Sequence, residues 1–87
     1  MRFKWKYGYI HKSRYLDRSG EKVRLKEHLS RLIEDPYNSR SGVDIKKLRG
    51  KNHDLYRLRV GDHRFEYFVE EDTIWIERAF KRERGYR

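Results

Sequence analysis

The stretch from Leu55 to Val69 constrains the fold most strongly, because it has the alternating pattern of a β-hairpin. Two alternating segments flank Gly61-Asp62, and glycine readily takes the positive φ that the first position of a type II′ turn requires. The apolar face of this hairpin should comprise Tyr56, Leu58, Val60, Phe65, Tyr67 and Val69. The opposite face should carry Arg57, Arg59, Arg64, Glu66 and Phe68. Three arginines on one pleated face repel one another, so either solvent screens them or an anion binds there.

Two helices are predicted between a first strand and the hairpin. Residues 2–9 alternate between aromatic and basic side chains, which is typical of a half-buried strand. A short polar helix is expected over residues 10–18, with Ile10, Tyr15 and Leu16 as anchors, and Ser19-Gly20 ends it. The clearest helix spans residues 21–34 and stops at Asp35-Pro36, because proline disfavours the α conformation in the residue before it. Its apolar stripe comprises Leu25, Leu29, Leu32 and Ile33, with Val23 near the edge.

The remaining segments complete a two-layer α+β domain. Residues 37–42 read as a loop, and residues 43–48 as either a strand or a turn. A last strand is predicted over residues 73–80, with Ile74 and Ile76 on one side and Trp75 and Ala79 on the other. The layout is an N-terminal strand, a two-helix hairpin and an antiparallel three-stranded meander, all in a single domain over residues 1–87. The first strand rejoins the sheet after the helices, so it can lie parallel to a neighbour.

Composition narrows the partners and the chemistry. The formal net charge is +9, which favours polyanions such as RNA, DNA or an acidic protein. The chain has no cysteine, which excludes disulfides and Cys-based zinc sites, and its four histidines lack metal-ligand spacing. We therefore expect neither metal nor cofactor. No apolar run approaches the length of a membrane span, so a cytoplasmic protein without a membrane partner is expected.

A second group of cations follows the last predicted strand. It comprises Lys81, Arg82 and Arg84, with Tyr86 beside them. If that strand pairs beside the hairpin, this tail reaches the arginine face. Guanidinium groups bind phosphate as a bidentate fork and stabilise the extra charge of a phosphorane-like transition state. The alternative is general electrostatic affinity, with surface salt bridges to Glu66 and Glu83. The residues alone favour binding over catalysis.

Three motifs, in their order along the chain, resemble those of the RelE/ParE superfamily of toxins, and most closely those of the archaeal RelE-type mRNA interferases. They are Lys47-Leu48-Arg49-Gly50, the segment from Leu55 to Arg64, and Lys81-Arg82 followed by Tyr86. The resemblance implies a metal-independent endoribonuclease that cleaves mRNA on the ribosome and so inhibits translation. In that reaction the ribose 2′-hydroxyl attacks the adjacent phosphate and leaves a 2′,3′-cyclic phosphate and a 5′-hydroxyl.

The resemblance also implies roles for individual residues. Arg57 and Arg59 would hold substrate phosphates and help deprotonation, and Arg64 would stabilise the transition state. Arg82 would protonate the leaving oxygen, and Tyr86 would stack on or orient the nucleotide. Further RNA contacts are expected from Lys47, Arg49, Lys81 and Arg84. Two positions depart from the pattern: Arg59 is a poorer base than lysine, and Lys81 stands where many relatives carry histidine. Glu66 is the candidate replacement for the base.

Other readings stay open on the same fold. ParE-type relatives inhibit DNA gyrase and lack the nuclease residues, and a third possibility is an RNA-binding protein that does not cleave. Either toxin implies an acidic, helical antitoxin that covers the arginine face or displaces the segment around Tyr86. Its docking surfaces would be the apolar patches near Trp5 and Trp75 and the amphipathic helix. Ordinary core packing is the alternative for both tryptophans.

Overall fold

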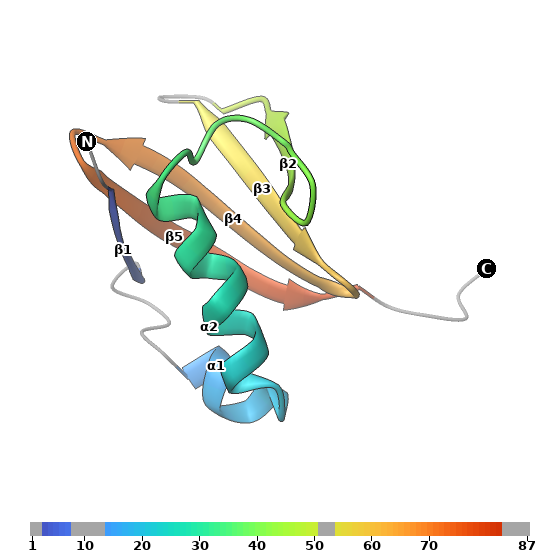
Figure 1. Cartoon of the computed structure of the whole chain (residues 1–87). Helices are drawn as coiled ribbons and strands as arrows, with labels where there is room; N and C mark the ends of the chain where they lie inside the picture. The colour runs from blue at the N-terminus through green and yellow to red at the C-terminus, as the bar shows by residue number, and fades with distance from the viewer. Residues whose placement is uncertain (1–2, 8–13, 51–53, 83–87) are drawn as a thin grey trace.

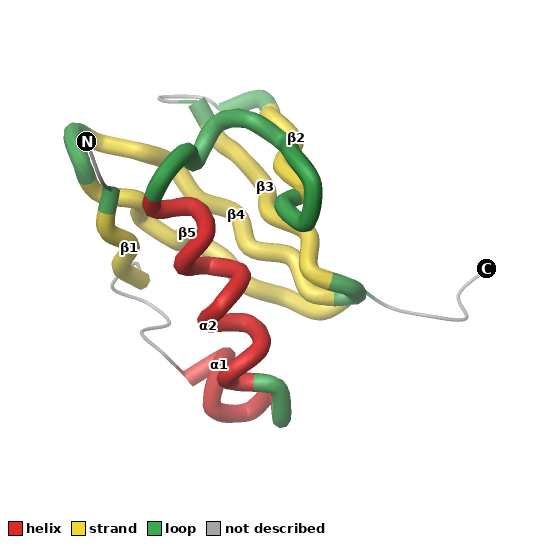
Figure 2. Tube along the Cα trace, viewed as in Figure 1, coloured by secondary structure: helices red, strands yellow, loops and turns green. Residues whose placement is uncertain are grey.

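A computed structural model describes residues 3–7, 14–50 and 54–82, which form a layer of helices against a five-stranded sheet (Figure 1). The elements are β1 (Lys4–Tyr7), α1 (Arg14–Ser19), α2 (Lys22–Ser30), the 3-10 helix η1 (Arg31–Ile33), β2 (Asp44–Leu48), β3 (Leu55–Val60), β4 (His63–Glu70) and β5 (Thr73–Lys81). The strand order is β1-β5-β4-β3-β2. The helices lie together on one face of the sheet (Figure 2). The predicted two-layer α+β fold is confirmed.

Pairing within the sheet settles two points that the sequence left open. Residues 44–48 form strand β2, which pairs antiparallel with β3 and extends the predicted meander by one strand. Strand β1 pairs parallel with β5, with Lys4 beside Thr73 and Tyr7 beside Ile76. The first strand therefore returns to the sheet in the parallel sense, one of the two arrangements that the sequence allowed. Residues 8–13, which include the predicted anchor Ile10, lie outside the described residues.

The predicted hairpin forms strands β3 and β4. Gly61 has a φ of 60°, while Asp62 is not among the residues with positive φ, as a type II′ turn requires. Leu58 pairs with Phe65, and both side chains are buried against the helices. Strict alternation then directs the neighbouring arginines away from the helices, to the other face of the sheet.

Helix α2 supplies most of the helical side of the core. Leu25, Leu29 and Leu32 are completely buried, which confirms most of the predicted stripe. Val23 is 74 % exposed and so lies outside the buried stripe rather than at its edge. No helix in the described ranges is long and apolar enough to span a membrane.

The predicted second helix is regular α-helix only in its first part. Regular α-helix stops at Ser30, and one 3-10 turn carries the chain to Ile33, ahead of Asp35-Pro36. The Asp35 carboxylate accepts hydrogen bonds from the backbone N–H groups of Tyr37 and Asn38, which fixes the turn after the helix. The Arg40 guanidinium donates to three carbonyl oxygens of this segment, those of Arg31, Asp35 and Asn38. Backbone acceptors that the helix end leaves unpaired are thus satisfied.

A β-bulge in β5 corrects the predicted orientation of Ala79. The β4–β5 register shifts between Glu66 and Tyr67, which pair with Arg78 and Ile76, so Glu77 is the extra residue. Alternation restarts after the bulge. Ala79 therefore pairs with Phe65 and packs against the core, instead of sharing the outer face with Trp75.

A hydrogen-bonded network joins the helices to the turn end of the hairpin. His63 is only 3 % exposed, and its Nδ1 lies 2.8 Å from the Tyr15 hydroxyl. Its Nε2 lies 3.0 Å from Glu21 Oε2, and the other oxygen of Glu21 accepts from Arg24. The hydrogen bond from His63, followed by that from Arg24, lowers the pKa of Glu21. Each nitrogen of a buried imidazole therefore has a partner, as burial requires.

Replacing Tyr67 by phenylalanine should lower the free energy of unfolding by about 1–2 kcal/mol. The Tyr67 hydroxyl donates to the Pro36 carbonyl at 2.7 Å in a buried position, and the variant leaves that acceptor without its donor. Urea unfolding measures the change. The partly exposed Tyr37 is the matched control, and Tyr37→Phe should cost less than about 0.5 kcal/mol. Equal losses in both variants would contradict a specific role for the Tyr67 bond.

The Glu21→Gln variant should lose less stability than the wild type as the pH falls. Glu21 has its pKa lowered from 4.5 by folding, so the stability it contributes is complete above that pH and is lost as pH falls below it. The stability difference between wild type and variant should therefore shrink between about pH 5 and pH 3. Urea unfolding across this range measures it, with Glu27→Gln on the exposed side of α2 as the control for one lost charge. A constant difference at every pH would refute the linkage.

Candidate anion-binding site

The outer face of the sheet carries an open hollow of about 580 Å³ at the turn end of the β3–β4 hairpin. Among the described residues it is lined by Arg57, Arg59, Arg64, Phe80, Lys81 and Arg82. The register brings them together, because Arg59 pairs with Arg64 and Arg64 pairs with Phe80. The Arg82 backbone N–H donates to the Asp62 carbonyl at 2.7 Å, which fixes the tail beside the turn. The four arginines thus surround one open space, while Lys81 pairs with His63 and also lines the helix-side pocket beside Tyr15.

Arg64 is the most constrained of these cations. Its side chain is only 7 % exposed, and Nη1 donates to the carbonyl oxygens of Gly61 at 2.8 Å and His63 at 3.1 Å. Within the described part of the chain, no acceptor is bonded to Nε or Nη2, and these two nitrogens form one bidentate edge of the guanidinium. Burial, then the charges of Arg59, Arg57 and Arg82, lowers the pKa of Arg64. An anion at the open edge would relieve that repulsion.

The carboxylates of Asp44 and Glu66 make long ion pairs near the hollow, and the charge of Asp62 opposes the lowering of the Arg64 pKa. Arg59 Nε lies 3.7 Å from Asp44, with both side chains more than half exposed. Glu66 pairs across the sheet with Arg57 on one side and Arg78 on the other, and its carboxylate lies 3.7 Å from Arg78 Nη1. The exposed Arg59–Asp44 pair contributes little, and the Glu66–Arg78 pair is loose at this distance. The hollow keeps a strongly positive character.

Two residues of this face were missed by the sequence analysis. Phe80 lines the hollow, and the Arg78 guanidinium lies 4.4 Å from the centre of its ring. Both face outward only because of the bulge at Glu77, since unbroken alternation would have turned them toward the helices. The one sequence signal is the pair of consecutive charges at Glu77 and Arg78, which interrupts the apolar alternation of β5.

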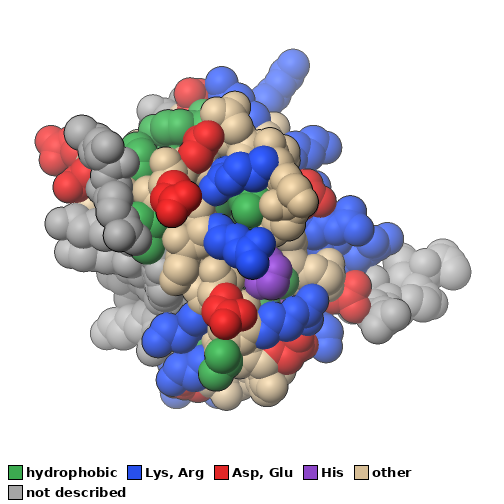
Figure 3. Space-filling view, in the orientation of Figure 1, with side chains coloured by type: hydrophobic (Ala, Val, Ile, Leu, Met, Phe, Trp, Pro, Cys, Tyr) green, Lys and Arg blue, Asp and Glu red, His purple; other side chains and the backbone are tan. Residues whose placement is uncertain are grey.

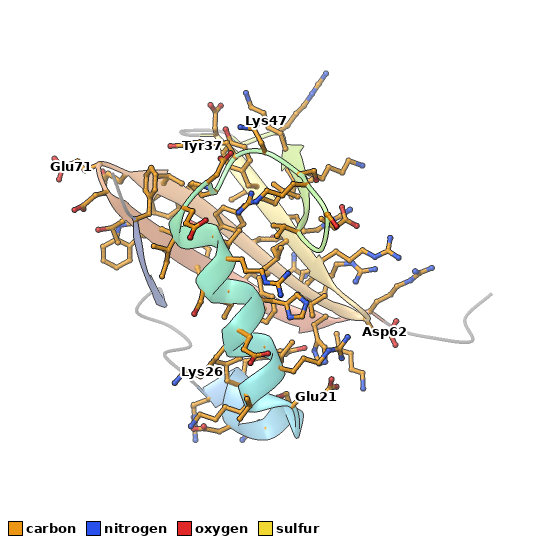
Figure 4. The ribbon with its side chains drawn as sticks, viewed as in Figure 1. Glu21, Lys26, Tyr37, Lys47, Asp62 and Glu71 are labelled. Atoms are coloured by element: carbon orange, nitrogen blue, oxygen red, sulfur yellow. The ribbon has the colours of Figure 1, made fainter. Side chains whose placement is uncertain are left out.

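The other predicted contact residues do not gather at this hollow. Lys47 lies at the opposite end of the hairpin from Asp62 and pairs with Asp54 at 3.6 Å (Figure 4). Its register partner is Tyr56, so it points to the helix side of the sheet, and Lys46 instead shares the outer face with Arg57. Arg49 is exposed and does not line the hollow. Arg84 and Tyr86 lie outside the described residues.

The helix-covered side of the molecule has a different charge pattern. Figure 3 shows Lys and Arg side chains there interspersed with Asp and Glu. In residues 3–7, 14–50 and 54–82, no three His, Cys, Asp or Glu side chains gather as metal ligands would. The arrangement at the hollow can therefore bind and stabilise anionic groups through fixed cations.

Comparison with known proteins bears on the family and the fold. A scan against models of protein families finds no match. Toxin RelE3 of Methanocaldococcus jannaschii is 36% identical over 66 residues, covering 71% of this chain and 74% of the relative. The archaeal RelE-RelB complex from Pyrococcus horikoshii has a similar chain with a TM-score of 0.75 and 29% identity, covering 98% of this chain and 100% of that one. A chain of the RelB-RelE antitoxin-toxin complex from Methanococcus jannaschii shares the fold, with a TM-score of 0.63 at 23% identity over 87% of this chain and 88% of that one. The chain belongs to the RelE family of toxins.

Proposed function

We propose that this toxin is an endoribonuclease that cleaves mRNA on the ribosome and so inhibits translation. The observation that carries the proposal is the Arg64 fork, which is held at Nη1, has no acceptor at Nε or Nη2 among the described residues, and lies beside Arg57, Arg59 and Arg82. A singly charged phosphodiester gains negative charge as it becomes pentacoordinate, and fixed cations stabilise that change without reorganising. The family assignment supports a toxin, and the cationic hollow supports a nucleic acid as its target.

The proposed reaction needs no water as a reactant. The ribose 2′-oxygen forms a bond to the adjacent phosphorus as its proton passes to solvent, and the bond from phosphorus to the 5′-oxygen breaks as that oxygen takes a proton back from solvent. The products are a 2′,3′-cyclic phosphate and a 5′-hydroxyl. Arg64 would bind the non-bridging oxygens, while Arg57 and Arg59 hold the phosphate in place. Arg82 would stabilise the departing oxygen, because a guanidinium keeps its proton too firmly to be an efficient acid.

The proposed chemistry depends little on a general base. Arg59 stays protonated, so its role would be electrostatic. Glu66 is the nearest carboxylate by register, beside Arg57, but it does not line the hollow and is ion-paired with Arg78. We therefore assign the main effect to the cations, and Glu66→Gln should reduce cleavage far less than loss of Arg64. Lys81, a further proposed RNA contact, lines the hollow. Proposed contacts at Arg49 and Arg84, and nucleotide stacking on Tyr86, remain predictions.

We also propose an acidic, helical antitoxin as the partner of this chain in the cytoplasm. Two similar solved chains come from RelE–RelB complexes, which supports a partner of this kind. Carboxylates on such a partner would compete with RNA phosphates for the cations of the hollow. The formal net charge of +9 favours association with an acidic protein.

Arg64→Ala should reduce the rate of mRNA cleavage on programmed ribosomes by about 10²–10³-fold, the usual cost of losing one preorganised donor. Arg64→Lys should restore little, because an ammonium group cannot replace the bidentate fork. End-group analysis of the wild-type product should show the 2′,3′-cyclic phosphate. Lys47→Ala is the matched control, since it removes one positive charge outside the hollow and should change the rate by less than about threefold.

Failure of the wild type to cleave, with salt-sensitive RNA binding intact, would overturn the nuclease proposal. The hollow would then be a binding surface, and gyrase supercoiling would be the next assay. Equal losses in Arg64→Ala and Lys47→Ala would show that overall charge, rather than the fork, controls activity.

The antitoxin proposal is tested by growth of a bacterial host that expresses the toxin. Wild type should arrest growth and Arg64→Ala should not, because the variant lacks the fork. A library of genomic fragments from the source of the toxin should yield a fragment that restores growth and encodes an acidic, helical protein that co-purifies with it. Rescue only by fragments whose products do not bind the toxin would contradict the proposal.

A further inference from the structure

The side chains of Tyr15, His63 and Glu21 form a continuous chain of hydrogen bonds behind the cationic hollow. The distances are 2.8 Å from the Tyr15 hydroxyl to His63 Nδ1 and 3.0 Å from His63 Nε2 to Glu21 Oε2. We propose that this network positions the Arg64 fork for phosphate binding, through the backbone of His63. The functional part of this inference rests on the proposed function, whereas the restraint on Arg64 can be measured without RNA.

The partners determine which nitrogen of neutral His63 carries the proton. A carboxylate can only accept, so Nε2 donates to Glu21, and Nδ1 is left to accept from the Tyr15 hydroxyl. Every polar atom of the ring is thereby used, and the ring is almost completely buried. Tyr15 also packs edge-on against the His63 and Phe65 rings, with centroids 5.8 Å apart in each case. The orientation of the imidazole is therefore fixed from two sides.

The backbone of His63 transmits this restraint to the other face of the sheet. His63 and Arg64 are consecutive strand residues, so their side chains point to opposite faces. The carbonyl of His63 accepts from Arg64 Nη1 at 3.1 Å, and the Gly61 carbonyl two residues earlier accepts from the same nitrogen at 2.8 Å. The fixed imidazole therefore restrains the backbone of His63. The carbonyl oxygen of that residue in turn orients the Arg64 guanidinium.

The restraint on Arg64 acts at the turn between β3 and β4. The turn is the end of the hairpin, where terminal ladder bonds open most easily. His63 is the first residue of β4 and pairs with Lys81, which also lines the hollow. Tyr15 belongs to α1 and Glu21 directly precedes α2, so the network ties this end of the hairpin to the helical layer. Fraying of the turn would move Arg64 and Lys81 together.

The test follows the Arg64 side chain by NMR in the protein without RNA. The signals of the Arg64 Nη1 hydrogens are assigned by their loss in Arg64→Lys. Tyr15→Phe keeps the ring and removes the hydroxyl, and Glu21→Ala removes the carboxylate. Each should raise the solvent-exchange rate of the Arg64 Nη1 hydrogens roughly five- to tenfold, the effect expected from weakening one hydrogen bond. Glu21→Gln keeps an acceptor for Nε2–H and should stay close to wild type.

Two controls separate positioning from general destabilisation. Tyr37→Phe removes a hydroxyl outside the network, and the backbone amide of the buried Leu29 reports opening of the core. The inference is overturned if Tyr15→Phe and Glu21→Ala leave Arg64 exchange unchanged. It is also overturned if Arg64 and Leu29 exchange accelerate equally, which would indicate global loosening. If the wild type does not cleave mRNA on the ribosome, the proposed function is refuted. The restraint on Arg64 is tested separately, because the exchange experiment contains no RNA.

Discussion

The carbonyl groups of the turn between β3 and β4 hold the cationic site together. Gly61 and His63 direct their oxygens at the Arg64 side chain, and Asp62 accepts from the backbone of Arg82. Arginine has donors only, so carbonyl oxygens are the neutral groups best suited to orient it without cancelling its charge. The positive φ of Gly61 makes this geometry possible in a two-residue turn.

Like charges at the hollow are therefore brought together at a cost in electrostatic free energy. Burial and three neighbouring guanidinium groups lower the pKa of Arg64 against the opposing charge of Asp62, and the carboxylates of Asp44 and Glu66 pair with Arg59 and Arg78. The packing of β4 against α2 supports this arrangement, since Phe65 and Tyr67 are completely buried directly behind the charged face. A cluster of cations lowers the stability of the fold, and a bound anion would offset the repulsion between them.

Alternation and turn chemistry were sufficient to predict the hairpin, its apolar face and the outward arginines. They were also sufficient for α2, because Leu25, Leu29 and Leu32 recur at helical spacing. The bulge at Glu77 was not predictable, since one extra residue reverses alternation without changing composition, and Ala79 and Phe80 were affected. The His63 network was missed for another reason: its members lie far apart in the chain and meet only through tertiary packing.

The parallel pairing of β1 with β5 has a consequence for the timing of synthesis. These strands lie at opposite ends of the described chain, so the sheet cannot close until β5 has left the ribosome. Lys81 and Arg82 are translated later still than most of β5, and they complete the hollow. The cationic hollow is thus incomplete on a nascent chain until the last strand has emerged.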